Sequence, residues 1–222
     1  MALTVHRADL LLPGAGHAPV PGGAVLVDGR TIQAVGPYGE LAAAHPAARV
    51  RRWPGVLTPG LRNPYGPELL ERAYHPDPRE ADELGTEPLT GTALAALEMT
   101  ESRWGASARR GVRAMLAHGT VAVVGRLWRE TVADAVARSG LAVEQRLTEP
   151  PGPPTPDPLA QDRPVEEAFV LPPLDSPGRR ADFAVFDVTV PADDDPYTAL
   201  ARAGAVSCVA TILDGRLVHR RA

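Results

Sequence analysis

The sequence predicts an α/β protein in which β-rich segments at both ends enclose a middle region of alternating helices and strands. Two Asp-Gly pairs, at residues 28–29 and 214–215, each separate two short apolar runs and are typical of two-residue hairpin turns. Residues 107–147 alternate between helical and strand patterns. Ten prolines between residues 150 and 177 deprive that stretch of backbone donors and favour extended conformations.

The N-terminal part predicts short strands joined by turns. Residues 3–12 alternate loosely and end in a Leu-Leu-Leu run, and residues 22–36 form the first hairpin. Residues 40–44 predict one helical turn, and residues 49–53 lead into an apolar strand that begins at Val56. Together these segments predict an all-β layer.

The middle of the chain has the most regular pattern. Prolines interrupt residues 64–90, where 68–73 predicts a short helix, and a second short helix is expected over 90–98. The helix predicted over 107–118 carries its apolar residues on one face, and Gly119 ends it; the apolar residues are Ala108, Val112, Met115 and Leu116. A strand over 120–124, a helix over 130–139 and a strand over 141–147 follow. Such a run predicts parallel strands with right-handed crossovers.

The C-terminal part returns to β structure. Residues 178–187 predict a strand, and Asp195-Pro196 predicts the cap and first position of a helix that Gly204 ends. Residues 206–213 and 217–219 form the second hairpin.

The composition excludes several classes of chemistry and partner. The 222 residues include 23 arginines and no lysine, so a Schiff-base, pyridoxal-phosphate, Walker or carboxylated lysine is impossible. A single cysteine, Cys208, excludes a disulfide framework and a Cys-based zinc site. A net charge of −4 argues against nucleic acid and anionic membranes as partners. The N-terminus has no signal-peptide pattern and no apolar run approaches a membrane span, so a cytoplasmic protein is expected.

Several segments, in order along the chain, resemble the amidohydrolase superfamily. The N-terminal motifs ADLLLPG, AVLVDGRTIQAVGP and PGVLTPGL are similar to the opening of imidazolonepropionase-like and aminodeoxyfutalosine-deaminase-like proteins. WGASARRGVRAMLAHGTVAVVG resembles the first helix and second strand of their barrel, and ADFAVFD and VATILDGRLVH resemble their last strands. The resemblance covers roughly residues 1–67, 100–147 and 178–222.

The resemblance implies a specific domain organisation. Residues 1–56 and 178–222 would form the two halves of a small composite β-sandwich, and residues 57–149 a truncated TIM-barrel-like βαβαβ segment. Residues 150–177 would be a proline-rich linker or surface wrap. A complete barrel takes roughly 250 residues, and about half that number lies between residues 56 and 177.

The resemblance also implies a metal site whose ligands this chain lacks. In the superfamily, Pro-Gly after the first barrel strand is followed by His-x-His, which holds the catalytic metal. In VLTPGLRNPYGP those two positions fall on Tyr65 and Pro67. We therefore predict no catalytic, cofactor-binding or metal-binding residue.

The remaining polar residues suggest structural roles. His75 is expected in an exposed loop near the barrel mouth, with Asp77 beside it. His118 is expected at a helix C-terminus, where capping is favoured. The other histidines, 6, 17, 45 and 219, are interpreted as surface residues. Asp182 and Asp187 predict packing or turn roles, residues 193–195 helix capping, and Cys208 a buried thiol. Trp53, Trp104 and Trp128 are interpreted as core residues.

Three hypotheses for function follow. The first is an amidohydrolase-related protein that has lost its metal and its catalysis and serves as a binding or assembly module. The second is a surviving carbon–nitrogen hydrolase or deaminase with zinc or another divalent metal held by His75, His118 and Asp77, with a dimer completing the site. The third is a regulatory partner of a full-length amidohydrolase. Because a partial barrel has open sheet edges, we also expect a homodimer. The sequence does not identify a small-molecule ligand.

Overall fold

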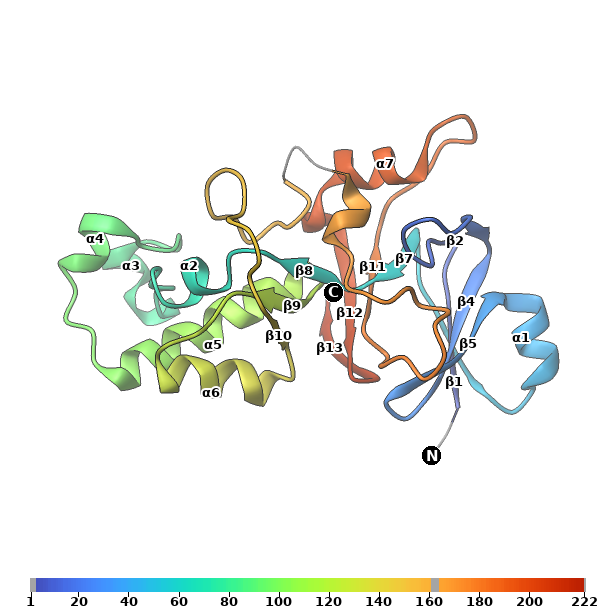
Figure 1. The fold of residues 1–222 in the computed structure, drawn as a ribbon, viewed down its shortest axis with the longest axis horizontal. Helices are drawn as coiled ribbons and strands as arrows, with labels where there is room; N and C mark the ends of the chain where they lie inside the picture. Colours follow the sequence, from blue (N-terminus) through green and yellow to red (C-terminus); the bar gives the residue numbers. More distant parts are fainter. Residues whose placement is uncertain (1–2, 161–163, 222) are drawn as a thin grey trace.

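The protein is described by a computed structural model that covers residues 3–160 and 164–221 (Figure 1). These residues form a mixed α/β structure with a six-stranded, a four-stranded and a three-stranded sheet. No helix in these two ranges is long and apolar enough to cross a membrane.

The six-stranded sheet joins the two ends of the chain. Its order is β13-β12-β11-β7-β2-β3, and its strands are β2 (Leu10–Leu11), β3 (Val20–Pro21), β7 (Val56–Pro59), β11 (Phe183–Phe186), β12 (Cys208–Leu213) and β13 (Arg216–Arg220). The N-terminal β7 pairs antiparallel with the C-terminal β11, from Val56 opposite Phe186 to Pro59 opposite Phe183. All residues of β7 and β11 are buried, as expected for strands in the middle of a packed sheet.

The four-stranded sheet is built entirely from the N-terminal part. Its order is β5-β4-β1-β6, with β1 at Thr4–Arg7, β4 at Gly23–Asp28, β5 at Thr31–Pro37 and β6 at Arg49–Arg52. The hairpin predicted at Asp28-Gly29 is present, but the loop is Gly29-Arg30, because Asp28 still pairs with Thr31 in the ladder. The segment predicted as one strand over 3–12 is divided between β1 and β2, which belong to different sheets.

The two hairpin turns contact each other. Asp214 and Gly215 have φ angles of 56° and 73°, as the predicted two-residue turn requires. A Cβ atom on Gly215 would lie 1.8 Å from the carbonyl oxygen of Gly29, so only glycine fits there. An ion pair of 2.6 Å between Arg30 and Asp214 joins the same turns. The contacts between these two turns therefore hold the N- and C-terminal parts of the chain together.

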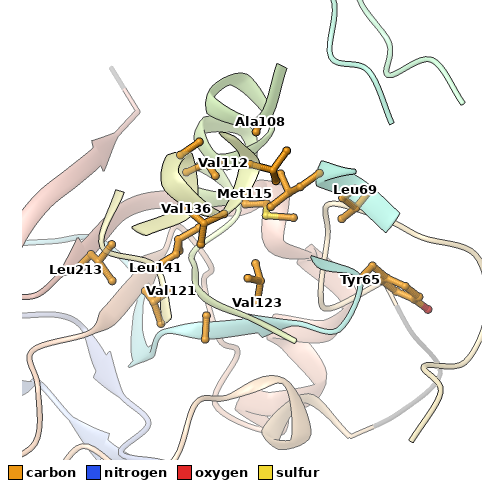
Figure 2. Close-up of a cluster of buried hydrophobic side chains, with 14 of the residues drawn as sticks. Tyr65, Leu69, Ala108, Val112, Met115, Val121, Val123, Val136, Leu141 and Leu213 are labelled. Carbon is orange, nitrogen blue, oxygen red and sulfur yellow. The ribbon is translucent and has the colours of Figure 1, made fainter. Parts of the chain in front are cut away.

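The three-stranded sheet is parallel and carries two helices. Its order is β10-β9-β8, with β8 at Leu61–Asn63, β9 at Thr120–Val124 and β10 at Ala142–Glu144. Helices α5 (Glu101–Ala117) and α6 (Glu130–Ser139) connect the strands and pack against one another (Figure 1). Their apolar faces and β9 form the buried cluster in Figure 2, which includes Val112, Met115, Val123 and Val136.

The predicted boundaries of this segment are accurate except for the first helix and for the last strand, which is predicted over 141–147 and spans only Ala142–Glu144. The bounds of β9 and α6 agree with the prediction, and Gly140 closes α6 in the left-handed conformation. Helix α5 begins six residues before the predicted Ser107, because Thr100 caps it by accepting a hydrogen bond from the backbone N–H of Arg103. The first turns of α5 contain Gly105, a weak helix former that interrupts the helical pattern of the sequence. Trp104 in the same turns is buried and packs into the core.

The remaining elements are short. They are α1 (Tyr38–Ala44), α2 (Gly66–Leu70), α3 (Ala81–Leu84), α4 (Gly91–Ala95), α7 (Pro196–Ala203) and three 3₁₀ turns at Pro78–Glu80, Val165–Ala168 and Ala205–Ser207. Asp195 caps α7 through Thr198 N–H at 2.8 Å, and Gly204 ends it, as predicted.

The proline-rich residues 150–160 and 164–177, here called the strap, cross the parallel sheet. Leu61 in β8 forms an isolated antiparallel bridge with Phe169, and Val170 N–H donates to the Gly60 carbonyl at 2.9 Å. Phe169 and Leu174 are buried in the two cores on either side of β7. The strap therefore supplies core side chains although it has little regular structure.

Candidate functional site

The carboxyl ends of β8, β9 and β10 border a cavity of about 660 Å³. Ligand sites in proteins with parallel strands lie preferentially at this edge. The cavity is lined by residues that follow the strand ends, such as Pro64, Val124 and Gln145, and by strap residues such as Pro150 and Phe169. This edge is therefore the candidate functional site.

Asn63 and Tyr65, at the end of β8, bind the strap. The Asn63 side-chain amide donates to the carbonyl oxygens of Thr155 and Pro156 at 2.9 and 3.3 Å. The Asn63 side-chain oxygen accepts from the Tyr65 backbone N–H at 2.9 Å, which fixes the turn after the strand. The Tyr65 hydroxyl donates to the strap carbonyls of Pro151 and Gly152. In Figure 2 the Tyr65 ring lies at the margin of the buried cluster, with its hydroxyl pointing away from it.

These residues do not fit the metal that the resemblance implies. Zinc sites use His, Cys, Asp or Glu ligands that converge on one point with an open position for water. Tyr65 directs its hydroxyl to backbone carbonyls, and Pro67 is buried at the start of α2. Within residues 3–160 and 164–221, no group of three His, Cys, Asp or Glu side chains could hold a metal ion.

The face of the parallel sheet on the strap side carries an ion pair across β9. Arg62 in β8, Ala122 in β9 and Ala142 in β10 are register partners, so they lie on one face. The Arg62 guanidinium contacts the Glu144 carboxylate at 3.0 Å, with small Ala122 between the two strands. This pair joins β8 to β10 beside the cavity.

A second ion pair closes the other side of the strand ends. Arg146, just after β10, donates to both carboxylate oxygens of Glu68 at 2.9 and 2.7 Å and to the Pro64 carbonyl at 2.9 Å. Burial acts to raise the pKa of Glu68, but the hydrogen bonds from Arg146, a backbone hydrogen bond and the charges of Arg146 and Arg72 together leave the pKa lowered. Helix α2 is thereby fixed to β10 by a bidentate pair of the stronger kind.

His75 has a structural role and is not the exposed loop residue that was predicted. Its Nε2–H donates to the Leu69 carbonyl at 2.8 Å, and its backbone N–H donates to Ser107 Oγ at 2.9 Å. Burial, opposed by the Leu69 hydrogen bond, lowers the pKa of His75. Asp77 caps the following 3₁₀ turn and contacts Arg110 at 3.2 Å.

The other sequence predictions have mixed outcomes. His118 Nδ1 donates to the Ala114 carbonyl at 2.8 Å, which confirms its place at the helix end. Asp182 accepts from the Asp214 N–H at 2.7 Å, which confirms a turn role, and Cys208 is buried. Two predictions are wrong: His6 is 3% exposed beneath Trp53, and Trp128 is 72% exposed.

Sequence reasoning missed Asn63, Arg62 and Arg146. Asn63 stands two residues before Tyr65 in the motif that carries the resemblance, so a polar residue at a strand end was the available signal. The strap carbonyls that these strand ends bind lie about 90 residues later in the chain, and no local pattern connects the two.

Comparison with protein families gives one match. Residues 23–48, which comprise β4, β5 and α1, match the imidazolonepropionase-like composite domain of bacteria. This segment is imidazolonepropionase-like. The match confirms, over this composite-domain segment, the resemblance to the amidohydrolase superfamily that the sequence motifs predict.

Solved structures give partial similarity beyond the composite-domain segment. The A. niger ochratoxinase is 22% identical with a TM-score of 0.45, covering 65% of this chain and 31% of that chain. An adenosine deaminase from Xanthomonas campestris with bound zinc is 18% identical with a TM-score of 0.43, covering 63% and 32%. A guanine deaminase from Bradyrhizobium japonicum is 19% identical with a TM-score of 0.43, covering 67% and 35%. The chain thus spans about a third of these proteins. No curated protein matches the sequence.

Proposed function

We propose that this chain is an amidohydrolase-derived binding module that does not catalyse hydrolysis, because its own strap occupies the strand ends where relatives bind a metal. The observation that carries the proposal is the pair of side chains at the end of β8. Asn63 and Tyr65 donate to the carbonyls of residues 151–156. In this proposal the three parallel strands are the remnant of a TIM-type barrel, and the strap takes the place of the later strands.

In this proposal the strap and a metal exclude one another at this position, because the strap holds the side chains at the strand end. A catalytic metal needs several ligands aimed at one point and a water position left open. Here the strand-end groups already have partners, and those partners are carbonyls tied to a buried segment. Two other candidate metal ligands also have partners: His75 hydrogen-bonds to the Leu69 carbonyl, and Asp77 forms an ion pair with Arg110.

The cavity beside the strap supports binding of a small organic molecule. Its volume of about 660 Å³ lies in the range of ligand sites. Its wall is mainly apolar, with Val124, Leu147 and Phe169, and acidic Glu166 and Glu167 lie at its strap side. Such a site favours an apolar ligand with few polar groups.

A turnover assay tests the proposal. The purified protein is incubated with Zn²⁺, and separately with Mn²⁺, Fe²⁺ and Ni²⁺, in the presence of cyclic amides and aminopurines. The X. campestris adenosine deaminase serves as the positive control for the aminopurine arm. We expect no metal-dependent turnover from the chain or from its Tyr65→Phe variant. Zinc-dependent turnover by the unmodified chain would overturn the proposal.

A further inference from the structure

A second cavity, of about 250 Å³, lies against the same sheet and adjoins the candidate site at Leu171. Its wall includes Val121, Ala122 and Ala142 from the parallel sheet, Val170 from the strap, and Arg179, which follows the strap. Glu144, Arg180 and Asp182 also line this cavity, so its wall combines apolar and charged side chains, and Arg179 contributes a deeply placed guanidinium.

Arg179 is a buried cation with unused hydrogen-bond donors. The residue is 7% exposed, and its Nη2 donates to the Val170 carbonyl at 3.2 Å. Among the described residues, Nε and Nη1 of Arg179 have no hydrogen-bond partner, and both atoms are buried. A buried guanidinium with unpaired donors is strongly unfavourable unless an anion or acceptor compensates it. Groups of this kind in a folded protein call for a partner.

The neighbouring carboxylates of Asp182 and Asp175 attract Arg179 electrostatically, but each also contacts another residue. Asp182 pairs with Arg180. Glu144 pairs with Arg62 at 3.0 Å, and Asp175 contacts His17 at 3.0 Å. Arg179 thus lies among charged groups, yet its Nε and Nη1 donors have no hydrogen-bond partner among the described residues.

We propose that this cavity binds a small monocarboxylate, with the carboxylate on Arg179 and a short apolar body against Val121, Ala122 and Ala142. A carboxylate supplies acceptors for a guanidinium that has two unused donors, and a charge-assisted hydrogen bond to guanidinium is of the stronger kind. Ligand binding would break at most one hydrogen bond of the guanidinium, the 3.2 Å bond from Nη2 to the Val170 carbonyl. Arg179 lines this cavity and not the strand-end cavity, and the proposal does not depend on whether the protein catalyses a reaction.

Isobutyrate and its neutral isostere isobutyramide are the probes. Calorimetric titration at constant ionic strength is expected to give saturable 1:1 binding of isobutyrate and none of isobutyramide, and isobutyrate is expected to raise Tm. Arg179→Met is expected to weaken isobutyrate binding about tenfold or more and to raise the ligand-free Tm, because it removes an unpaired buried charge. Arg202→Met, which alters an arginine paired with Asp194 outside this cavity, is the matched control and is expected to keep the affinity.

Three results would overturn the proposal. They are no saturable isobutyrate binding, an equal response to isobutyramide or to chloride, and unchanged affinity in Arg179→Met. If Arg179→Met does not fold, the Nε–H signals of the unmodified protein decide the matter by ¹⁵N NMR. One arginine Nε–H, assigned with Arg179→Lys, is expected to shift on isobutyrate addition. The absence of any such shift would contradict the site. None of these readouts depends on metal or turnover, so the proposed function stands or falls separately.

Discussion

At the residue scale, two polar side chains decide what the end of β8 can do. Tyr65 lies where the resemblance implies a metal-binding histidine, and Asn63 stands two residues before it; both donate hydrogen bonds to the strap. The acceptors are neutral backbone carbonyl oxygens, so the polar side chains at the end of β8 have their hydrogen-bond partners within the protein. The contact depends on the position of the strap carbonyls opposite these donors. In solvent the same donors would hydrogen-bond to water.

Removal of these donors should loosen the strap. Asn63→Ala and Tyr65→Phe each delete a hydrogen bond to residues 151–156, and each is expected to lower stability by about 1 kcal/mol. Limited proteolysis, read by mass spectrometry, should then show faster cleavage within 150–160. Tyr38→Phe is the matched control, because Tyr38 belongs to α1 and its ring contacts Arg7. Equal cleavage rates in all four proteins would refute the role given to these donors.

His6 should make the protein sensitive to acid. Burial, and then the charge of Arg51, lower the pKa of His6 to about 3, and its Nδ1 accepts a hydrogen bond from Trp53 Nε1–H at 3.1 Å. The unfolded value is about 6.5. Between these values the unfolded chain binds a proton that the folded chain does not, so stability falls as the pH drops from about 6.5 towards about 3.

The expected slope for His6 is on the order of 1.4 kcal/mol per pH unit within that window. Urea unfolding between about pH 4 and pH 6 measures it. His6→Gln keeps an acceptor for Trp53 and removes the titrating group, so its slope should be smaller by that amount. Parallel slopes for the variant and the parent would show that His6 is not the group responsible.

At the element scale, helix α5 fixes the loop that carries His75. Gly111 faces this loop, and a Cβ at that position would lie 2.6 Å from His75 Nε2 and 2.8 Å from Leu70 Cδ2. Gly105 in the same helix has its nearest neighbour, Thr131 Cβ, at 3.4 Å, an ordinary contact. The two glycines therefore have different reasons to be present.

Alanine substitution at the two glycines should have opposite effects. Gly105→Ala is expected to stabilise the protein by up to about 1 kcal/mol through helix propensity. Gly111→Ala gains the same propensity but forces His75 and Leu70 to move, so a net loss of about 1–3 kcal/mol is expected. Urea unfolding of the two single variants against the parent measures both. A stabilising Gly111→Ala would mean that α5 does not press on this loop.

Local patterns predict the elements well where packing follows the sequence. The bounds of β9 and α6 and the Asp214-Gly215 turn follow from apolar periodicity and glycine positions. Burial of His6 could not be predicted in the same way, because it results from stacking with Trp53, 47 residues away. The strap's contacts with Asn63 are equally non-local. Long-range contacts therefore account for what the sequence did not predict about the site.

At the scale of the whole molecule, the parallel sheet ends at an exposed strand. Strand β10 is the last strand in the order β10-β9-β8, and Val143 within it is 53% exposed. Leu147, just beyond the strand, is 86% exposed. Exposed edge strands with apolar residues readily pair with another chain.

We propose that β10 pairs with its copy in a homodimer. Two identical edges related by a twofold axis pair antiparallel, which would extend the sheet across the dimer. Light scattering at micromolar concentration should give a dimer mass, and Val143→Lys, which places a charge on the edge, should give a monomer. Val50→Lys, at an exposed position of β6, is the matched control and should remain dimeric. A monomeric parent protein at these concentrations would contradict the proposal.

The most direct test of the central claim is the metal content of the purified, tag-free protein, measured per chain by elemental mass spectrometry. The claim is that the strap, held by Asn63 and Tyr65, takes the place of a metal at the strand ends. It predicts near-zero zinc, iron, manganese and nickel, also after incubation with each ion and desalting. About one metal per chain or per dimer, the content of a loaded catalytic centre, would contradict the account.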